Sequence, residues 1–299
     1  MTKFNKGLLF GVSAYIIWGL LPLYWKLVEE AGAYEILAHR GIWSLLICVS
    51  LLALRKQLKS AYEMVRSSRT FSLLFLASGL LTINWGVYIW SVTVNRVVEA
   101  ALGYYITPLI NVTFGVLLLR EKLRPAQWIA VALAAAGVVI LTLGYGSLPW
   151  IALVLAISWG SYSLIKKSLN LGALETLSLE TLFAFLPNLV FILIIQGNGS
   201  AEFGSTWTIS ILLFGAGAAT VIPLLLFNGS TTRLPLSTVG LLQYITPTIM
   251  FVIGIYVNNE DISTTKVLGF AFIWLALAVL SRDLYRSSRP LDDGIAKAL

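Results

Sequence analysis

The sequence predicts an all-α polytopic membrane protein whose ten transmembrane helices form two inverted five-helix repeats. Three observations lead to this fold class. Apolar runs of about 20 residues, the length that crosses a hydrocarbon core of roughly 30 Å, recur along most of the chain. Basic residues concentrate in alternate connections between these runs. A short motif in the first half of the chain recurs in the second half.

The composition leaves little material for a soluble domain. The 299 residues are 58% hydrophobic and only 12% charged, which is far more apolar than a soluble core requires. The longest internal polar stretches, 55–69 and 196–205, are too short to bury a core and are expected to be loops. The first apolar run follows Lys3 and Lys6 as a signal peptide would, but it is too long and lacks a cleavage site, so it is expected to be a retained span. The single cysteine, Cys48, cannot form an intrachain disulfide.

Charged, Gly/Pro and Asn/Ser clusters divide the chain into ten candidate spans. Their continuous apolar character favours helices over the alternating strands of a membrane barrel. The predicted spans of the first half are 7–25, 34–54, 71–91, 97–119 and 126–144. Those of the second half are 148–165, 173–195, 208–228, 235–257 and 266–282. The predicted domains are therefore a first repeat at 1–144, a second at 145–285, and a short cytoplasmic tail at 286–299.

The distribution of basic residues predicts the orientation. Of the 21 Lys and Arg residues, 17 fall on one side of the predicted membrane, and only Lys26, Arg96 and Lys266 fall on the other. The remaining one, Arg40, lies inside the second span. Because cytoplasmic loops carry the excess of basic residues, both termini are placed in the cytoplasm of a bacterial-type inner membrane. The net charge of +7 is thus a topology signal, and the lipid bilayer rather than a nucleic acid is the expected partner.

An internal repeat connects the two halves. The motif Tyr-Ile-Thr-Pro at 105–108 recurs at 244–247, and the same offset of 139 carries Glu121 onto Glu260. Five spans per repeat is an odd number, so the second half must enter the membrane from the opposite side. Inverted repeats are typical of secondary transporters, because two mirrored gates around one central site permit alternating access. The alternative is that the duplication served only to build a chain of ten helices and has no role in transport.

The repeated spans, each with a central proline and a following glutamate, resemble the EamA repeat of the drug/metabolite transporter superfamily along nearly the whole chain. More specific stretches resemble the RarD group within it: His39-Arg40 with Trp43-Ser44, Asn84-Trp85-Gly86-Val87-Tyr88, Asn95-Arg96-Val97-Val98-Glu99-Ala100, Leu102-Gly103-Tyr104, Glu180-Thr181 and Leu242-Gln243-Tyr244-Ile245. The resemblance implies a ten-helix basket with a central cavity and the export of drugs or metabolites. It implies no particular substrate.

Ionisable side chains inside spans are costly and are therefore candidates for function. An offset of 140 places Arg40 on Glu180, so the two halves carry opposite charges at equivalent depths. We hypothesise that Arg40 lines the outer half of the cavity and holds a substrate carboxylate or phosphate. Glu180 would line the inner half and gate it or balance charge. The alternative is that Arg40 forms a structural bridge with Glu35 or Glu99.

Two further ionisable residues are candidates for gating or charge coupling. His39 is the only histidine and has an unperturbed pKa near neutral pH, although a histidine near a helix end commonly forms hydrogen bonds within a bundle. Glu99 lies about one turn beyond Arg96 at the outer end of the fourth span. It is equally well explained as a partner of Arg96 or as a cap of a helix N-terminus.

Polar side chains also share faces of the predicted helices, which must then turn away from lipid. The candidates for substrate binding on these faces are Asn84 and Tyr88 in the third span, Tyr104 and Asn111 in the fourth, and Gln243 in the ninth. Pro108 and Pro247 occupy equivalent positions in the two repeats. Each removes a backbone hydrogen bond, which predicts one hinge per repeat or, alternatively, an inherited packing kink.

Aromatic residues in the first and sixth spans complete the predicted binding site. Trp18, Trp159 and Tyr162 lie deep in their spans and suit a cavity for amphipathic or aromatic solutes. In contrast, Trp25, Trp150 and Trp207 lie near span ends and are expected to be anchors at the membrane interface.

The sequence contains no motif for catalysis, nucleotide binding or metal binding, so no enzymatic activity, cofactor or metal is expected. The predicted function is secondary transport by alternating access, as an exporter or facilitator of small metabolites or drug-like solutes. Alternatives from other classes are a membrane-embedded enzyme and a non-transporting scaffold. Small-residue helices leave homodimerisation open without assigning a face.

Overall fold

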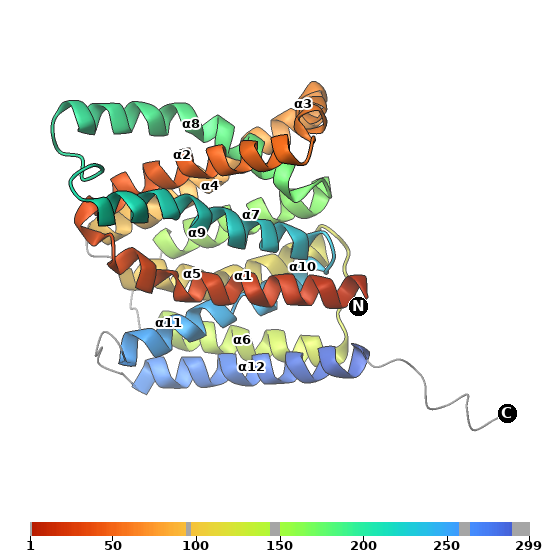
Figure 1. The fold of residues 1–299 in the computed structure, drawn as a ribbon. Helices are drawn as coiled ribbons and strands as arrows, with labels where there is room; N and C mark the ends of the chain where they lie inside the picture. The colour runs from red at the N-terminus through yellow and green to blue at the C-terminus, as the bar shows by residue number, and fades with distance from the viewer. Residues whose placement is uncertain (1, 94–96, 144–149, 257–263, 289–299) are drawn as a thin grey trace.

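All regular secondary structure described in this computed structural model is helical, and the helices pack side by side with their axes roughly aligned (Figure 1). The structure describes residues 2–93, 97–143, 150–256 and 264–288. In the first half, the elements are α1 (Lys3–Lys26), η1 (Glu29–Ala31), α2 (Gly32–Leu54), α3 (Leu58–Arg66), α4 (Ser68–Thr93), α5 (Val97–Leu117) and α6 (Pro125–Leu143). In the second half, they are α7 (Trp150–Leu169), α8 (Ala173–Gly197), α9 (Trp207–Thr231), α10 (Leu236–Leu242), α11 (Ile245–Tyr256) and α12 (Thr264–Ser288).

The chain is a multi-pass membrane protein by the length and composition of its helices. Helical segments occur at each of the ten predicted ranges. In the part of the chain that the structure describes, six segments are long and apolar enough to cross a membrane: Lys3–Lys26, Glu29–Leu54, Ser68–Tyr88, Pro125–Leu143, Ala173–Gly197 and Trp207–Thr231.

Two predicted segments differ from the structure. The predicted ninth span at 235–257 is two helices, α10 and α11, separated by a turn at Gln243 and Tyr244. The predicted loop at 55–69 contains the short helix α3. Ala61 of this helix is buried in a cluster that includes residues of α2 and α8. This packing stabilises a helix that is too short to persist alone.

Local sequence signals account for several helix ends. The Thr2 hydroxyl accepts a hydrogen bond from the Asn5 N–H, which caps α1. At the start of α6, Pro125 occupies the first helical position, and the Gln127 side chain accepts the Arg124 N–H. Helix α7 ends before Asn170, which adopts the left-handed φ of 47° that asparagine tolerates at helix C-termini.

The segments predicted to be cytoplasmic gather at one end of the bundle. The start of α1, helix α3 and the end of α12 all lie there in Figure 1. The opposite end carries the connection between α8 and α9. The two ends are called the basic end and the opposite end below.

Small residues hold α6 and α12 in close contact. Ala130 and Ala134 of α6 are fully buried in a cluster that includes Ile273 and Ala276 of α12. A Cβ atom added to Gly137 would lie 2.8 Å from the Gly269 carbonyl oxygen, so the two backbones approach too closely for a larger residue. These small residues therefore serve packing within the chain.

Glu121, which the repeat motif places after α5, anchors the start of α10. Its carboxylate accepts the backbone N–H groups of Leu236 at 2.6 Å and Ser237 at 3.0 Å, and the Ser237 hydroxyl at 2.7 Å. The carboxylate therefore satisfies donors that a helix N-terminus leaves without intrahelical partners.

We predict that Glu121→Ala lowers the free energy of unfolding by about 1–3 kcal/mol, because it leaves buried N–H donors without an acceptor. The measurement is unfolding of the purified protein in mixed micelles. Glu63→Gln is the matched control, since Glu63 is 58% exposed and forms only a long surface ion pair with Lys59. Equal effects of the two substitutions would show that Glu121 does not anchor α10.

Candidate functional site

A cavity of about 100 Å³ lies between α2, α4, α8 and α9. Each half of the chain contributes two of these helices. On α8, Glu180, Thr181, Ala184 and Asn188 follow one another at helical spacing and all line the cavity. Arg40 of α2 and Glu180 of α8 are the charged residues among its lining side chains. The structure thus brings the two predicted opposite charges to one cavity.

Arg40 is held by one hydrogen bond and two aromatic rings. Its Nε donates to the Thr220 hydroxyl at 2.9 Å. The guanidinium carbon lies 4.8 Å from the ring centroid of Trp25 and 4.7 Å from that of Trp85, which is the range of cation–π contacts. Trp25, predicted to be an interface anchor, therefore packs on this cation.

The structure pairs Glu35 elsewhere, so it forms no bridge with Arg40. The Glu35 carboxylate accepts the backbone N–H groups of Glu202 and Phe203 at 2.9–3.0 Å. His39 lies beside it, with Nε2 at 3.7 Å from the carboxylate, and its Nδ1 accepts the Trp43 indole N–H at 3.1 Å. The His39 ring also stacks on Phe203 at 4.7 Å. His39 therefore belongs to a cluster that joins α2 to the loop between α8 and α9.

Glu180 belongs to a compact buried network. Its carboxylate accepts hydrogen bonds from Lys166 Nζ at 2.7 Å and from the Tyr162 hydroxyl at 3.0 Å. Lys166 Nζ also donates to the Thr176 hydroxyl at 2.6 Å. The side chains of Lys166 and Glu180 are 4% and 1% exposed. A buried pair of this kind is sustained only when further hydrogen bonds satisfy both ions, as they do here.

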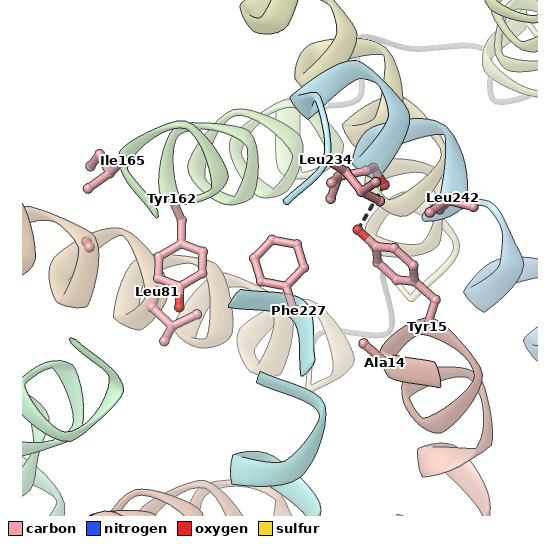
Figure 2. Close-up of a cluster of buried hydrophobic side chains, with 10 residues drawn as sticks. Ala14, Tyr15, Leu81, Tyr162, Ile165, Phe227, Leu234 and Leu242 are labelled. Atoms are coloured by element: carbon pink, nitrogen blue, oxygen red, sulfur yellow. Dashed lines mark hydrogen bonds between the residues drawn. The ribbon is translucent and has the colours of Figure 1, made fainter. Parts of the chain in front are cut away.

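Aromatic residues fill the core beside this network. Trp18 and Trp159 meet with ring centroids 5.4 Å apart. Figure 2 shows the Phe227 ring between those of Tyr15 and Tyr162, and its centroid is 6.3 Å from each. The Tyr15 hydroxyl donates to the Val239 carbonyl oxygen of α10 at 3.0 Å. The predicted residues Trp18, Trp159 and Tyr162 thus lie in a packed cluster next to the cavity.

The other predicted polar residues make contacts between helices. Asn84 donates to the Leu155 carbonyl oxygen and the Ser158 hydroxyl of α7 at 2.9 and 3.0 Å. Asn111 donates to the Gln243 side chain at 3.2 Å, which joins α5 to the turn between α10 and α11.

The two predicted tyrosines lie together near Arg40. The rings of Tyr88 and Tyr104 have centroids 6.0 Å apart. Both phenol groups are close enough to the Arg40 guanidinium to interact with it electrostatically. The side chain of Glu99 lies outside the described residues.

The two prolines occupy different local structures. Pro108 lies within the continuous helix α5, whereas Pro247 follows the turn at Gln243 and Tyr244. The preceding threonines differ as well. The Thr107 hydroxyl donates to the Gly103 carbonyl oxygen of its own helix at 2.7 Å, whereas the Thr246 hydroxyl donates to the Tyr15 carbonyl oxygen of α1 at 2.8 Å.

Comparison with known proteins places the chain in a family. The profile of the EamA-like transporter family matches residues 5–143 and 148–282. The chain belongs to the EamA-like transporter family. Protein RarD of Streptomyces exfoliatus is 46% identical over 287 residues, covering 95% of this chain and 91% of that protein. A Bacillus subtilis (strain 168) protein described as an uncharacterized transporter is 46% identical over 283 residues, with 93% and 94% covered.

Protein RarD of Escherichia coli (strain K12) is 36% identical over 286 residues, covering 95% of this chain and 97% of that protein. The predicted resemblance to EamA and RarD proteins is therefore confirmed. A solved crystal structure aligns with a TM-score of 0.72 at 18% identity, covering 93% of this chain and 98% of the other. At that identity the likeness establishes the fold alone.

Sequence reasoning does not find Lys166, because Lys166 and Lys167 lie between the sixth and seventh predicted spans and belong to the 17 basic residues predicted to be cytoplasmic. Its position four residues after Tyr162 places both on one helical face, a signal that would have found it. Trp25, Trp85 and Thr220 were missed as partners of Arg40, since only the tertiary packing brings them together. Within the described part of the chain, no group of three or more His, Cys, Asp or Glu side chains is arranged to hold a metal ion.

We predict that Lys166→Met and Glu180→Gln each lower the free energy of unfolding by about 3–5 kcal/mol, because each leaves its partner buried with an unpaired charge. The double variant is expected to lose much less than the sum of the two effects. The measurement is a double-mutant cycle from unfolding in mixed micelles. Additive effects would mean that the two residues do not stabilise each other.

Proposed function

We propose that this EamA-like chain is a secondary carrier, an exporter or facilitator that moves a small solute across a bacterial inner membrane by alternating access. In this proposal, ten helices cross the membrane as two inverted repeats around the cavity, and both termini are cytoplasmic. The observation that carries it is a cavity with an accessible cation, enclosed by two helices from each half of a chain whose relatives are named transporters. Such a site at the interface of repeats is where secondary carriers bind their solutes.

Helix packing supports the inverted repeat. The sequence repeat makes α1 equivalent to α7, α2 to α8, α4 to α9, and α6 to α12. If a two-fold axis relates the halves, each contact between helices should occur again between their equivalents. The contact of α1 with α9 has its counterpart in that of α7 with α4. The contact of α2 with α9 has its counterpart in that of α8 with α4. The contacts of α2 with α8 and of α6 with α12 convert into themselves. This is the pattern expected for a two-fold axis between the repeats.

The repeated Tyr-Ile-Thr-Pro motif supports two interconverting states. It lies in a continuous helix in α5 but spans a turn and the start of a new helix at α11. Two copies of one motif in two conformations are expected if one gate is open while the other is closed. In the opposite state, we expect the first copy to break and the second to straighten.

Contacts toward the basic end support a closed inner gate. The Lys166–Glu180–Tyr162 network joins α7 to α8, and Tyr15 joins α1 to α10. Two buried polar atoms in the same region, Trp159 Nε1 and Asn111 Oδ1, have no hydrogen-bond partner among the described residues. Buried polar groups are normally paired. These groups would gain water if the region opened in the other state.

The cavity size favours small metabolites over drug-sized solutes. Its volume of about 100 Å³ lies well below the roughly 300–1,000 Å³ typical of pockets for drug-sized ligands.

We predict saturable flux when the purified protein is reconstituted in liposomes and tested with a metabolite panel, with and without a pH gradient. Ala184→Trp should abolish it, because Ala184 lines the cavity. Leu193→Trp on the same helix is the control, since Leu193 is 62% exposed and lies outside the cavity. Absence of flux for every solute would refute the carrier function. Equal flux in the two variants would refute the cavity as the path of the solute.

We also predict that Tyr15→Phe opens the basic end more often, because it removes the hydroxyl that holds α10 to α1. In a Cys48→Ala background, Thr82→Cys in the cavity wall reports access of a membrane-impermeant thiol reagent from the cytoplasmic side. Its labelling rate should rise about tenfold if the lost hydrogen bond contributes about 1.4 kcal/mol to closure. Tyr62→Phe on exposed α3 is the control. An unchanged labelling rate in the Tyr15 variant would show that the Tyr15 hydroxyl does not hold the gate closed.

A further inference from the structure

The packing around Arg40 leaves one edge of its guanidinium group available to a ligand. Trp25 and Trp85 lie within cation–π distance of the guanidinium, and the Thr220 hydroxyl takes the Nε–H at 2.9 Å. No described residue accepts a hydrogen bond from Nη1 or Nη2. These two nitrogens form the end of the planar fork, which presents two parallel N–H donors.

Among the described residues, the positive charge of Arg40 also has no compensating anion. No carboxylate of the described residues lies within ion-pair distance of the guanidinium. Glu180, the acidic residue of the cavity wall, is already neutralised by Lys166 at 2.7 Å. Isolated charges away from water are costly, so an anion in the cavity would complete this arrangement.

The remaining wall limits the kind of anion. Leu37, Leu81, Leu177 and Leu224 line the same cavity as Arg40. The cavity therefore offers one unpaired positive charge and a mostly apolar surface, within a volume of about 100 Å³. A doubly charged phosphate would keep one charge unpaired in this setting, whereas a small carboxylate with an apolar body matches both features.

We propose that the cavity binds a small monocarboxylate, whose two oxygens accept hydrogen bonds from Nη1 and Nη2 of Arg40 and whose apolar body contacts the leucines of the wall. Planar carboxylates pair with the guanidinium fork in this bidentate way. Trp25, Trp85 and Thr220 hold the fork in position before the ligand arrives, which lowers the entropy lost on binding. The substrate class rests on the proposed carrier function, whereas the binding site itself does not.

Calorimetric titration of the full chain in detergent tests the site with matched acid and amide pairs, namely butyrate with butyramide and benzoate with benzamide. Each acid should bind at least about tenfold more tightly than its amide, because only the acid supplies a charge-assisted pair. Arg40→Gln should abolish this preference. Arg40→Lys should restore only part of it, because an ammonium group lacks the fork. Arg69→Gln, an exposed substitution outside the cavity, should leave it unchanged.

Two outcomes overturn the carboxylate site. One is equal or absent binding of acids and amides by the unaltered chain; the other is a preference that survives in Arg40→Gln. Ligand-induced thermal stabilisation of each variant provides a second readout, because it also shows whether Arg40→Gln is folded.

Liposome flux of the same pairs separates this proposal from the carrier function. Flux of amides but not acids would overturn the substrate class and leave the carrier intact. Arg40-dependent binding of acids without flux of any solute would leave the site intact and overturn the carrier. Flux of acids that is lost in Arg40→Gln supports both.

Discussion

The fold is organised around the need to compensate charges among apolar helices. Glu180 and Lys166 meet this requirement completely, since each ion has a charged partner and a hydroxyl donor or acceptor within 3.0 Å. Among the described residues, Arg40 meets it only in part, through two indole rings and one threonine hydroxyl. The cavity wall therefore carries a neutralised acidic residue, Glu180, and a basic residue, Arg40, whose charge these residues do not balance. The satisfied pair joins two helices, whereas the cation is the group that we propose binds the solute.

The sequence predicts the helices well because their signal is local. Apolar runs and charged breaks predict all the long helical segments, and the presence of Arg40 and Glu180 in one cavity follows from their equivalent positions in the repeats. The partners of these charges are less predictable. Trp85 lies on another helix and Thr220 lies 180 residues away in the sequence, so their contact with Arg40 exists only after the helices pack.

The break between α10 and α11 shows a second limit of sequence reasoning. The Tyr-Ile-Thr-Pro motif is identical in both halves, so its local propensity is the same at both places. The two copies differ in the bonds of their threonines: Thr107 bonds within α5, whereas Thr246 forms a tertiary hydrogen bond to α1. A proline weakens a helix at a known position, but the neighbours determine whether the helix breaks there.

The attachment of Glu35 to the loop between α8 and α9 has a mechanical consequence. Glu35 and Arg40 lie five residues apart on one rigid helix. The first holds the backbone of Glu202 and Phe203, and the second reaches into the cavity. If the proposed solute displaces Arg40, the same helix α2 transmits the displacement to Glu35 and to the loop that Glu35 holds at the opposite end of the bundle. Loop and cavity would then shift together, so binding of a solute inside the bundle would change the position of a loop on its surface.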